Sequence, residues 1–111
     1  MKIKKHDNYI ILQDERDDIN DFVSYLERIV PAKYADDNLV IDLIKYTSLE
    51  LTQLLLLLKL SNYHRSTKHS FVIVNDTIDV DDIPMEMIVV PTLLEAGDIV
   101  EMEEIERDLG F

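Results

Sequence analysis

Two short, almost continuously apolar segments constrain the fold of this chain most strongly. Leu39–Ile44 is interrupted only by Asp42, and Phe71–Val74 is apolar throughout. Such runs are typical of strands that are covered on both faces in a parallel sheet. We therefore expect the two segments to be adjacent central strands of one sheet.

Other strand and helix patterns surround these two segments. Tyr9–Leu12 predicts a strand with a partner at Lys2–Lys4, and Met87–Val90 predicts the last strand. Apolar positions over 19–30 recur at helical spacing, and Pro31 is expected to end that helix.

A second helix is expected between the two central strands. Thr47 and Glu50 have the spacing of a capping box, so Thr47 is the expected N-cap of a helix that runs to about Tyr63. Leucines on all sides predict that this helix packs between other elements. The acidic segment 76–86 leaves room only for a short helix or turn. The C-terminal segment is expected to form either one helix kinked near Gly97 or two short helices.

Strands that alternate with helices predict an α/β fold, a mostly parallel sheet of four to five strands with helices packed against it. The length of 111 residues fits a single domain over 1–111, with an acidic C-terminal extension over 98–111.

Composition disfavours several classes of function. The chain has no cysteine, which rules out disulfides and thiolate metal sites and favours a reducing cytoplasm. Its longest apolar run, Leu54–Leu58, is far shorter than the ~20 residues that span a bilayer. A formal net charge of −12 repels nucleic-acid phosphates. We therefore expect a cytoplasmic chain that binds another protein, not nucleic acid or a membrane.

The predicted order of elements resembles the STAS domain, the fold of bacterial anti-sigma factor antagonists. Leu39–Leu43 is similar to the hydrophobic strand of that family that ends in Asp-Leu. Ser70–Asn75 is similar to its next strand, and Val89–Ala96 to its last strand and the helix that follows. The resemblance covers nearly the whole chain and implies a role in protein-protein interaction.

The phosphorylation motif of the STAS family differs in this chain. Phosphorylated members carry an Asp-Ser-Ser-Gly-like sequence at the start of the second helix, where a partner kinase modifies a serine. The corresponding stretch, Lys45–Glu50, lacks the Asp-Ser pair and the glycine. The resemblance therefore implies a non-catalytic interaction module, regulatory or scaffolding, without the usual switch. A phospho-switched antagonist that uses Thr47 or Ser48 remains the alternative.

The C-terminal segment Glu101–Phe111 resembles that of short bacterial STAS-like proteins sometimes labelled ribonuclease Z. That label implies a metallo-β-lactamase nuclease, whose two metals need a His-x-His-x-Asp-His cluster and further ligands. The chain has only His6, His64 and His69, without such a cluster. We therefore expect no enzyme activity and no catalytic, cofactor or metal residues.

Two weaker metal hypotheses have simpler explanations. His64 and His69 are five residues apart, which does not place them on one helical face, and basic side chains near a helix end complement its dipole. The acidic residues between the last two strands lack the order of a calcium-binding loop, so we expect a solvated loop. These residues are Asp76, Asp79, Asp81, Asp82 and Glu86.

The acidic C-terminal segment contains apolar residues that predict either a partner contact or packing on the core of this chain. These residues are Ile99, Met102, Ile105 and Leu109. A basic group with opposite charge, formed by His64, Arg65, Lys68 and His69, precedes the second central strand. We expect the apolar residues to anchor a contact that charge steers, in a homodimer or with a different protein.

Overall fold

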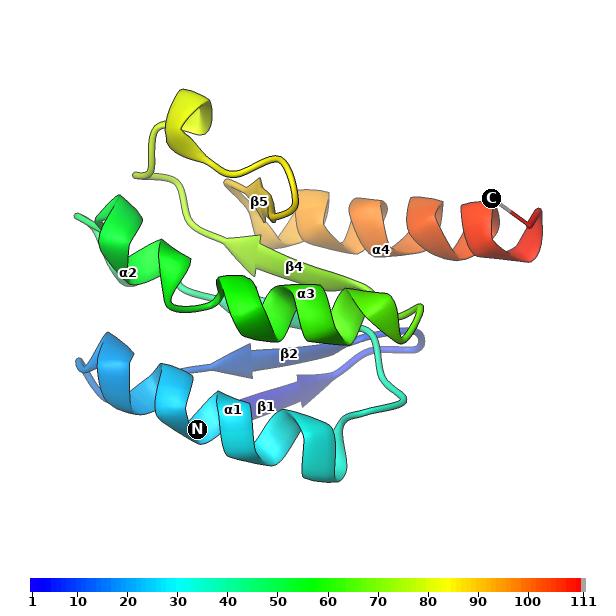
Figure 1. Cartoon of the computed structure of the whole chain (residues 1–111), viewed down its shortest axis with the longest axis horizontal. Coiled ribbons are helices and arrows are strands. Elements are labelled where there is room, and N and C mark those ends of the chain that lie inside the picture. Colours follow the sequence, from blue (N-terminus) through cyan, green and yellow to red (C-terminus); the bar gives the residue numbers. More distant parts are fainter. Residues whose placement is uncertain (111) are drawn as a thin grey trace.

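The computed structural model describes residues 1–110 as a five-stranded sheet with helices on both faces (Figure 1). Phe111, the last residue of the predicted domain, lies outside the described residues. The elements in chain order are β1 (Lys2–Lys5), β2 (Ile10–Gln13), α1 (Ile19–Lys33), β3 (Leu39–Asp42), α2 (Leu51–Leu55), α3 (Leu58–Ser66), β4 (Phe71–Val74), the 3-10 helix η1 (Val80–Asp82), β5 (Ile88–Val90) and α4 (Leu93–Asp108).

The strands lie side by side in chain order, β1-β2-β3-β4-β5. β1 pairs antiparallel with β2, and all other pairs are parallel. β3 and β4 are adjacent, every residue of both is buried, and Leu39 lies opposite Phe71. The predicted mostly parallel α/β sheet with these two central strands is confirmed.

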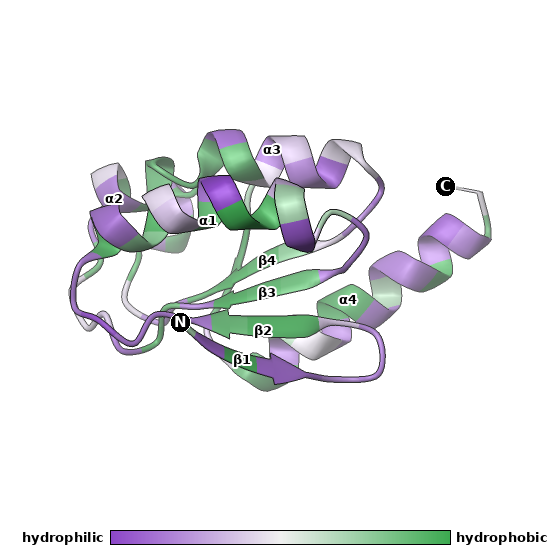
Figure 2. Cartoon of the chain, turned by 90° about the horizontal axis from the view of Figure 1, so that it is seen from below, coloured by the Kyte–Doolittle hydropathy of each residue, from purple (hydrophilic) through white to green (hydrophobic). Residues whose placement is uncertain are grey.

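The two faces of the sheet are covered unequally. α1, α2 and α3 lie on one face and enclose the larger core, whereas α4 alone crosses the other (Figure 2). Alternate residues of one strand serve the two sides, so that Leu39 and Ile41 join the larger core while Val40 joins the smaller one. A functional surface can therefore form on α4, or at the carboxyl or amino ends of the parallel strands.

The prediction that Pro31 ends the first helix is wrong, because α1 continues to Lys33. A proline removes one backbone donor, but its fixed φ is compatible with a helix. The last turn is retained because Tyr34 is buried and its backbone N–H donates to the carbonyl of Val30 at 2.9 Å.

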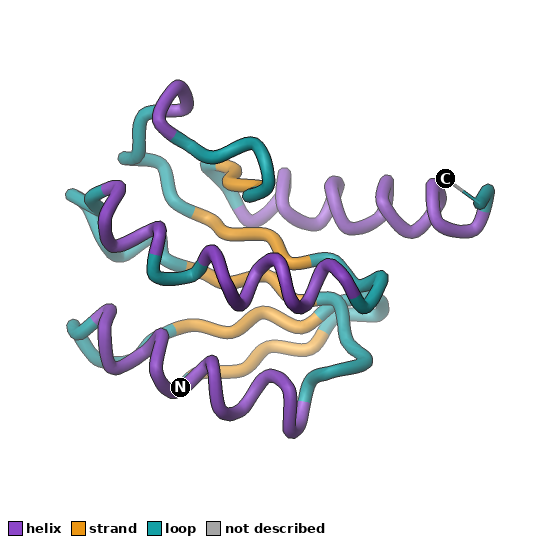
Figure 3. The backbone as a smooth tube through the Cα atoms, in the orientation of Figure 1, coloured by secondary structure: helices purple, strands orange, loops and turns teal. Residues whose placement is uncertain are grey.

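The predicted second helix is instead two helices, α2 and α3, which appear as separate coils in Figure 3. Leu56 and Leu57 separate them, and their N–H groups donate to carbonyls three positions back, at 3.2 and 3.0 Å, which is the pattern of a tighter turn than an α-helix. The break buries Leu54 and Leu57 completely and leaves Leu55 and Leu56 about two-fifths exposed. The leucine-rich helix is therefore not covered on all sides.

The C-terminal segment is one continuous helix, α4, and not two. Thr92 caps it, since its side chain accepts a hydrogen bond from the backbone N–H of Glu95 at 3.1 Å. Gly97 lies inside the helix where it meets Tyr9. A Cβ atom there would be 2.9 Å from the Tyr9 hydroxyl, so the glycine permits this close approach.

Candidate protein-interaction site

The carboxyl ends of the parallel strands bring three polar residues to one edge of the sheet. Asp14 follows β2, Asp42 ends β3 and Asn75 follows β4, and all three are buried. Asp42 accepts hydrogen bonds from the Ile44 backbone N–H at 3.0 Å and from the Gln13 side chain at 3.2 Å. The Asp42 carboxylate therefore holds the start of the loop after β3 and ties β3 to the neighbouring strand β2.

The loop 43–50 between β3 and α2 is fastened by side chains of this edge. Asn75 donates to the backbone carbonyls of Leu43 and Tyr46, both at 2.9 Å. The Tyr46 hydroxyl donates to Asp14. Burial, this hydrogen bond and the charges of nearby carboxylates raise the pKa of Tyr46, so the hydroxyl stays protonated as a donor.

Thr47 and Ser48 lie on the outside of this loop. Both are exposed, and no side-chain hydrogen bond within residues 1–110 involves either hydroxyl. The prediction that Thr47 caps the second helix is wrong. α2 begins at Leu51, and Glu50 is its N-cap, in a capping box with Gln53. Thr47 and Ser48 thus have no structural hydrogen bond within the described chain.

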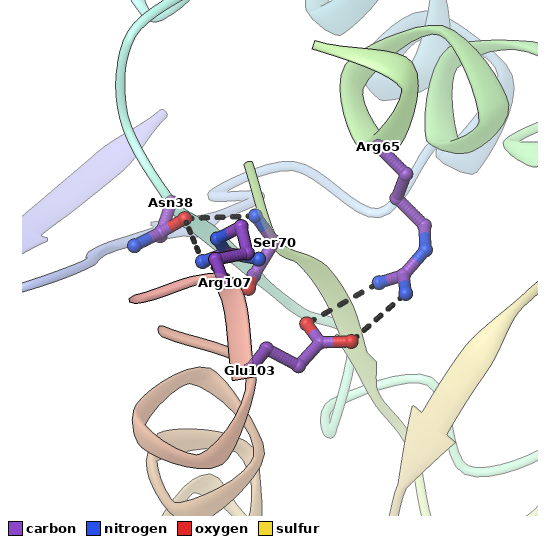
Figure 4. A network of polar contacts seen from close by, with 5 residues as sticks. All are labelled: Asn38, Arg65, Ser70, Glu103 and Arg107. Atoms are coloured by element: carbon purple, nitrogen blue, oxygen red, sulfur yellow. Dashed lines mark hydrogen bonds and ion pairs between the residues drawn. The ribbon is translucent and has the colours of Figure 1, made fainter. Parts of the chain in front are cut away.

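At the opposite edge of the sheet, the second half of α4 turns its charged side toward the body of the chain. Glu103 receives a bidentate contact from Arg65 of α3, at 2.8 and 3.4 Å (Figure 4). Burial opposes ionisation of Glu103, but Arg65, Ser70 and Arg107 outweigh it and lower the pKa of this carboxyl. The contact therefore holds a charged pair between α4 and α3 at neutral pH.

Asn38 is the centre of a second group of contacts to α4. Its amide nitrogen donates to Glu104 at 2.7 Å, and its amide oxygen accepts from Arg107 at 3.2 Å and from the Ser70 backbone N–H at 2.8 Å. Arg107 also donates to the Ser70 hydroxyl at 3.3 Å. Asn38 precedes β3 and Ser70 precedes β4, so the amino ends of both central strands fix the helix (Figure 4).

The opposite side of the same helical segment is apolar and exposed. Met102, Ile105 and Leu109 are 49%, 54% and 67% exposed. Ile99 differs, because it is half-buried against the smaller core. The structure thus separates the predicted apolar contact residues into one that packs on this chain and three that face solvent.

The four basic residues predicted to form a steering group do not form one exposed patch. His64 is wholly buried, and its Nε2–H donates to the backbone carbonyl of Asp37 at 2.6 Å. Arg65 is bound to Glu103, within this chain. Lys68 and His69 line a cleft of about 820 Å³ at the amino ends of the strands, beside acidic and basic side chains.

The residues 1–110 contain no group of three or more His, Asp or Glu side chains placed to hold a metal ion. In the acidic segment, Asp79 caps η1 by accepting from the Asp81 backbone N–H at 3.0 Å. Over the same described residues, no helix has the length and apolar character needed to cross a bilayer.

Sequence reasoning missed Asn38, Ser70, Asn75 and Glu103 as organising residues. The first two directly precede buried strands and Asn75 directly follows one. Buried polar residues at strand ends are rare unless they are hydrogen-bonded, so their position was an available signal. Nothing in the sequence distinguishes Glu103 from the other acidic residues of its segment.

Comparisons with known proteins support the fold but give no relative close in sequence. No protein-family model matches the chain, and no curated protein matches it. Five chains of known structure do match. One is RsbS of Moorella thermoacetica, in a form with serine replaced by glutamate, with a TM-score of 0.66 and 17% identity over 96% of this chain and 97% of that one. Another is the protein TM1081, with a TM-score of 0.62 and 16% identity over 89% of this chain and 86% of that one.

These likenesses in structure support a STAS-like fold for the chain. The fold expected from the sequence resemblance is confirmed.

Proposed function

We propose that this chain is a non-catalytic STAS-like interaction module of the cytoplasm, with a regulatory or scaffolding role. The observation that carries the proposal is the exposed apolar side of the second half of α4. A surface helix normally turns its apolar side to the core and its charged side to water. Here Met102, Ile105 and Leu109 face solvent, while Glu103 and Arg107 are bound to the rest of the chain.

The polar residues at the carboxyl edge support the same proposal. Asp14, Tyr46 and Asn75 use their polar atoms to hold the loop 43–50. A catalytic site needs a nucleophile, a base or metal ligands that converge on an open space. Because the polar atoms at this edge are already hydrogen-bonded within the chain, they favour a structural role over a catalytic one.

Affinity capture with the full chain, followed by binding measurements on each purified captured protein, tests the proposal. We expect a partner whose affinity falls about tenfold to a hundredfold with Ile105→Ser, because a buried isoleucine contributes roughly 1.5–3 kcal/mol. Leu55→Ser is the matched control, since Leu55 is an exposed apolar residue of α2 on the other face of the sheet. A captured set in which no protein depends on Ile105 contradicts the proposal.

A phospho-switched antagonist is the second candidate function, favoured by the exposed and unengaged hydroxyls of Thr47 and Ser48. In this case Thr47→Glu or Ser48→Glu should abolish binding of the captured partner at unchanged melting temperature, while the alanine variants bind normally. Equal binding by the glutamate and alanine variants rejects the switch.

A further inference from the structure

The exposed side of the second half of α4 has the pattern of a coiled-coil seam. Met102, Ile105 and Leu109 are separated by three and then four residues, the spacing of a, d and a positions in a heptad. Over one heptad a straight helix drifts only ~20° from the ideal repeat, so all three side chains share one face. That face is open, because α4 extends beyond the sheet at this end (Figures 1 and 2).

The positions that flank this seam are all acidic. With Met102 at position a, Glu101 and Asp108 occupy g and Glu106 occupies e, and all three are exposed. In coiled coils, the e and g residues form the ion pairs between helices that select the partner. No basic residue of α4 takes part, since Arg107 is at position f and is bound to Asn38 and Ser70.

We propose that this seam, Met102, Ile105 and Leu109 with Glu101, Glu106 and Asp108 beside it, pairs with a helix of a different protein that carries an apolar seam flanked by lysine and arginine. The proposal rests on the proposed function and names the chemistry of the partner. A second copy of this chain is disfavoured as the occupant, because its α4 would place acidic residues against acidic residues. Like charges across such a seam act against the wrong partner.

The polar contacts of α4 fix this geometry before a partner arrives. Glu103 and Glu104, at positions b and c, are bound to Arg65 and Asn38. The helix therefore presents its seam in one orientation, and little conformational freedom is lost on binding. A seam of one heptad is short, so the contact is expected to be transient.

The probe is a synthetic helical peptide of about three heptads with isoleucine at a, leucine at d and lysine at every e and g position. A second peptide carries glutamate at e and g. We expect the full chain to bind the lysine peptide at least about tenfold more tightly than the glutamate peptide, by fluorescence anisotropy. Ile105→Ser should weaken lysine-peptide binding about tenfold or more, whereas Leu94→Ser, at an exposed leucine near the start of α4, should not.

A charge-reversal pair separates steering by the seam from the effect of net charge. The double variant Glu101→Lys with Glu106→Lys should lose the lysine peptide and gain the glutamate peptide. The double variant Asp76→Lys with Glu86→Lys changes the net charge equally at exposed loop positions, and its preference should stay that of the original chain. Circular dichroism and melting temperature check that all variants are folded.

Three results would overturn the inference: equal binding of both peptides, equal effects of the two double variants, or a homodimer in sedimentation that dissociates with Ile105→Ser. None of them decides the proposed function. If any of these results is found while a captured partner still depends on Ile105, the proposed interaction function stands. Only the proposal that the partner is a basic helix is then rejected.

Discussion

The two halves of α4 face the same body with opposite chemistry. From Leu93 to Val100 the helix turns apolar side chains to the sheet, and Ala96 and Val100 are fully buried. From Glu101 onward, three charged side chains bind the rest of the chain, while the apolar ones face solvent. Apolar burial is non-directional, whereas a bidentate ion pair fixes an orientation. The comparison teaches that the second half is held in place by contacts that leave its apolar side chains available.

The largest expected effect comes from placing the same charge in both halves. Val100→Asp puts an unpaired carboxylate between the helix and the sheet and should lower the free energy of unfolding by about 3–5 kcal/mol. Ile105→Asp, at a site that is 54% exposed, should change it by less than about 0.5 kcal/mol. Urea unfolding of the two variants measures the difference. Similar losses would mean that the second half is also packed through its apolar side.

Arg65→Met tests the polar attachment of the second half. Because the pair with Glu103 is partly buried, its loss should cost about 1–2 kcal/mol, between the values of exposed and buried pairs. The control is Lys45→Met, which removes a pair with the fully exposed Asp17 and should cost at most about 1 kcal/mol. If the two substitutions are equivalent, the Arg65 contact does not fix α4.

The Arg65 contact also has a pH signature. The pKa of Glu103 is lowered from its ordinary value of 4.5, so the unfolded chain binds this proton more readily than the folded one. Its stabilisation is therefore present above pH 4.5 and is lost as the pH falls through the folded pKa. In Arg65→Met this part of the acid dependence should shrink.

Much of the fold could be predicted because it depends on burial patterns that are local in sequence. The apolar runs of β3 and β4 indicate strands covered on both faces, whichever helices cover them. The continuation of α1 through Pro31 and the break at Leu56 could not be predicted in this way. They depend on what Tyr34, Leu54 and Leu57 contact in the folded chain.

The candidate site was only half accessible to sequence reasoning, for a similar reason. The sequence shows apolar residues on two sides of the C-terminal helix, but it does not say which side packs on the sheet. That choice depends on Asn38 and Ser70, which lie far from α4 in sequence and bind Arg107. The same uncertainty applied to His64, which belongs to the interior and not to an exposed basic group.

A smaller effect on stability is expected from a substitution of His64. This residue is buried in the body of the chain and takes no part in the contacts of α4. Burial, reinforced by the charge of His69, lowers the pKa of His64, although the hydrogen bond to Asp37 opposes this. The unfolded chain therefore binds a proton more readily, and stability should fall as the pH drops below the ordinary value of 6.5.

His64→Phe should remove that pH dependence and cost about 0.5–1.5 kcal/mol at pH 7, from the lost hydrogen bond to Asp37. The stability curves of both proteins between pH 7 and about pH 5 measure this, a window above that of Glu103. A variant that keeps the full pH dependence would assign it to other groups.

The smallest expected effect concerns Lys68, where the predicted basic group meets the start of β4. Lys68 has a φ of 66°, in the left-handed region, just beyond the C-cap of α3, where its N–H donates to the carbonyl of Arg65. That conformation costs a non-glycine residue about 1–2 kcal/mol. Glycine avoids this cost, but it loses roughly 0.5–1 kcal/mol more in backbone entropy when the chain folds. Lys68→Gly should therefore stabilise the chain by about 0.5–1 kcal/mol in urea unfolding.

Lys68→Ala removes the same charge but keeps the strained backbone, so it should give no such gain. If both variants behave alike, the charge and not the backbone determines the effect. Neither should change lysine-peptide binding, because Lys68 is outside the seam of α4.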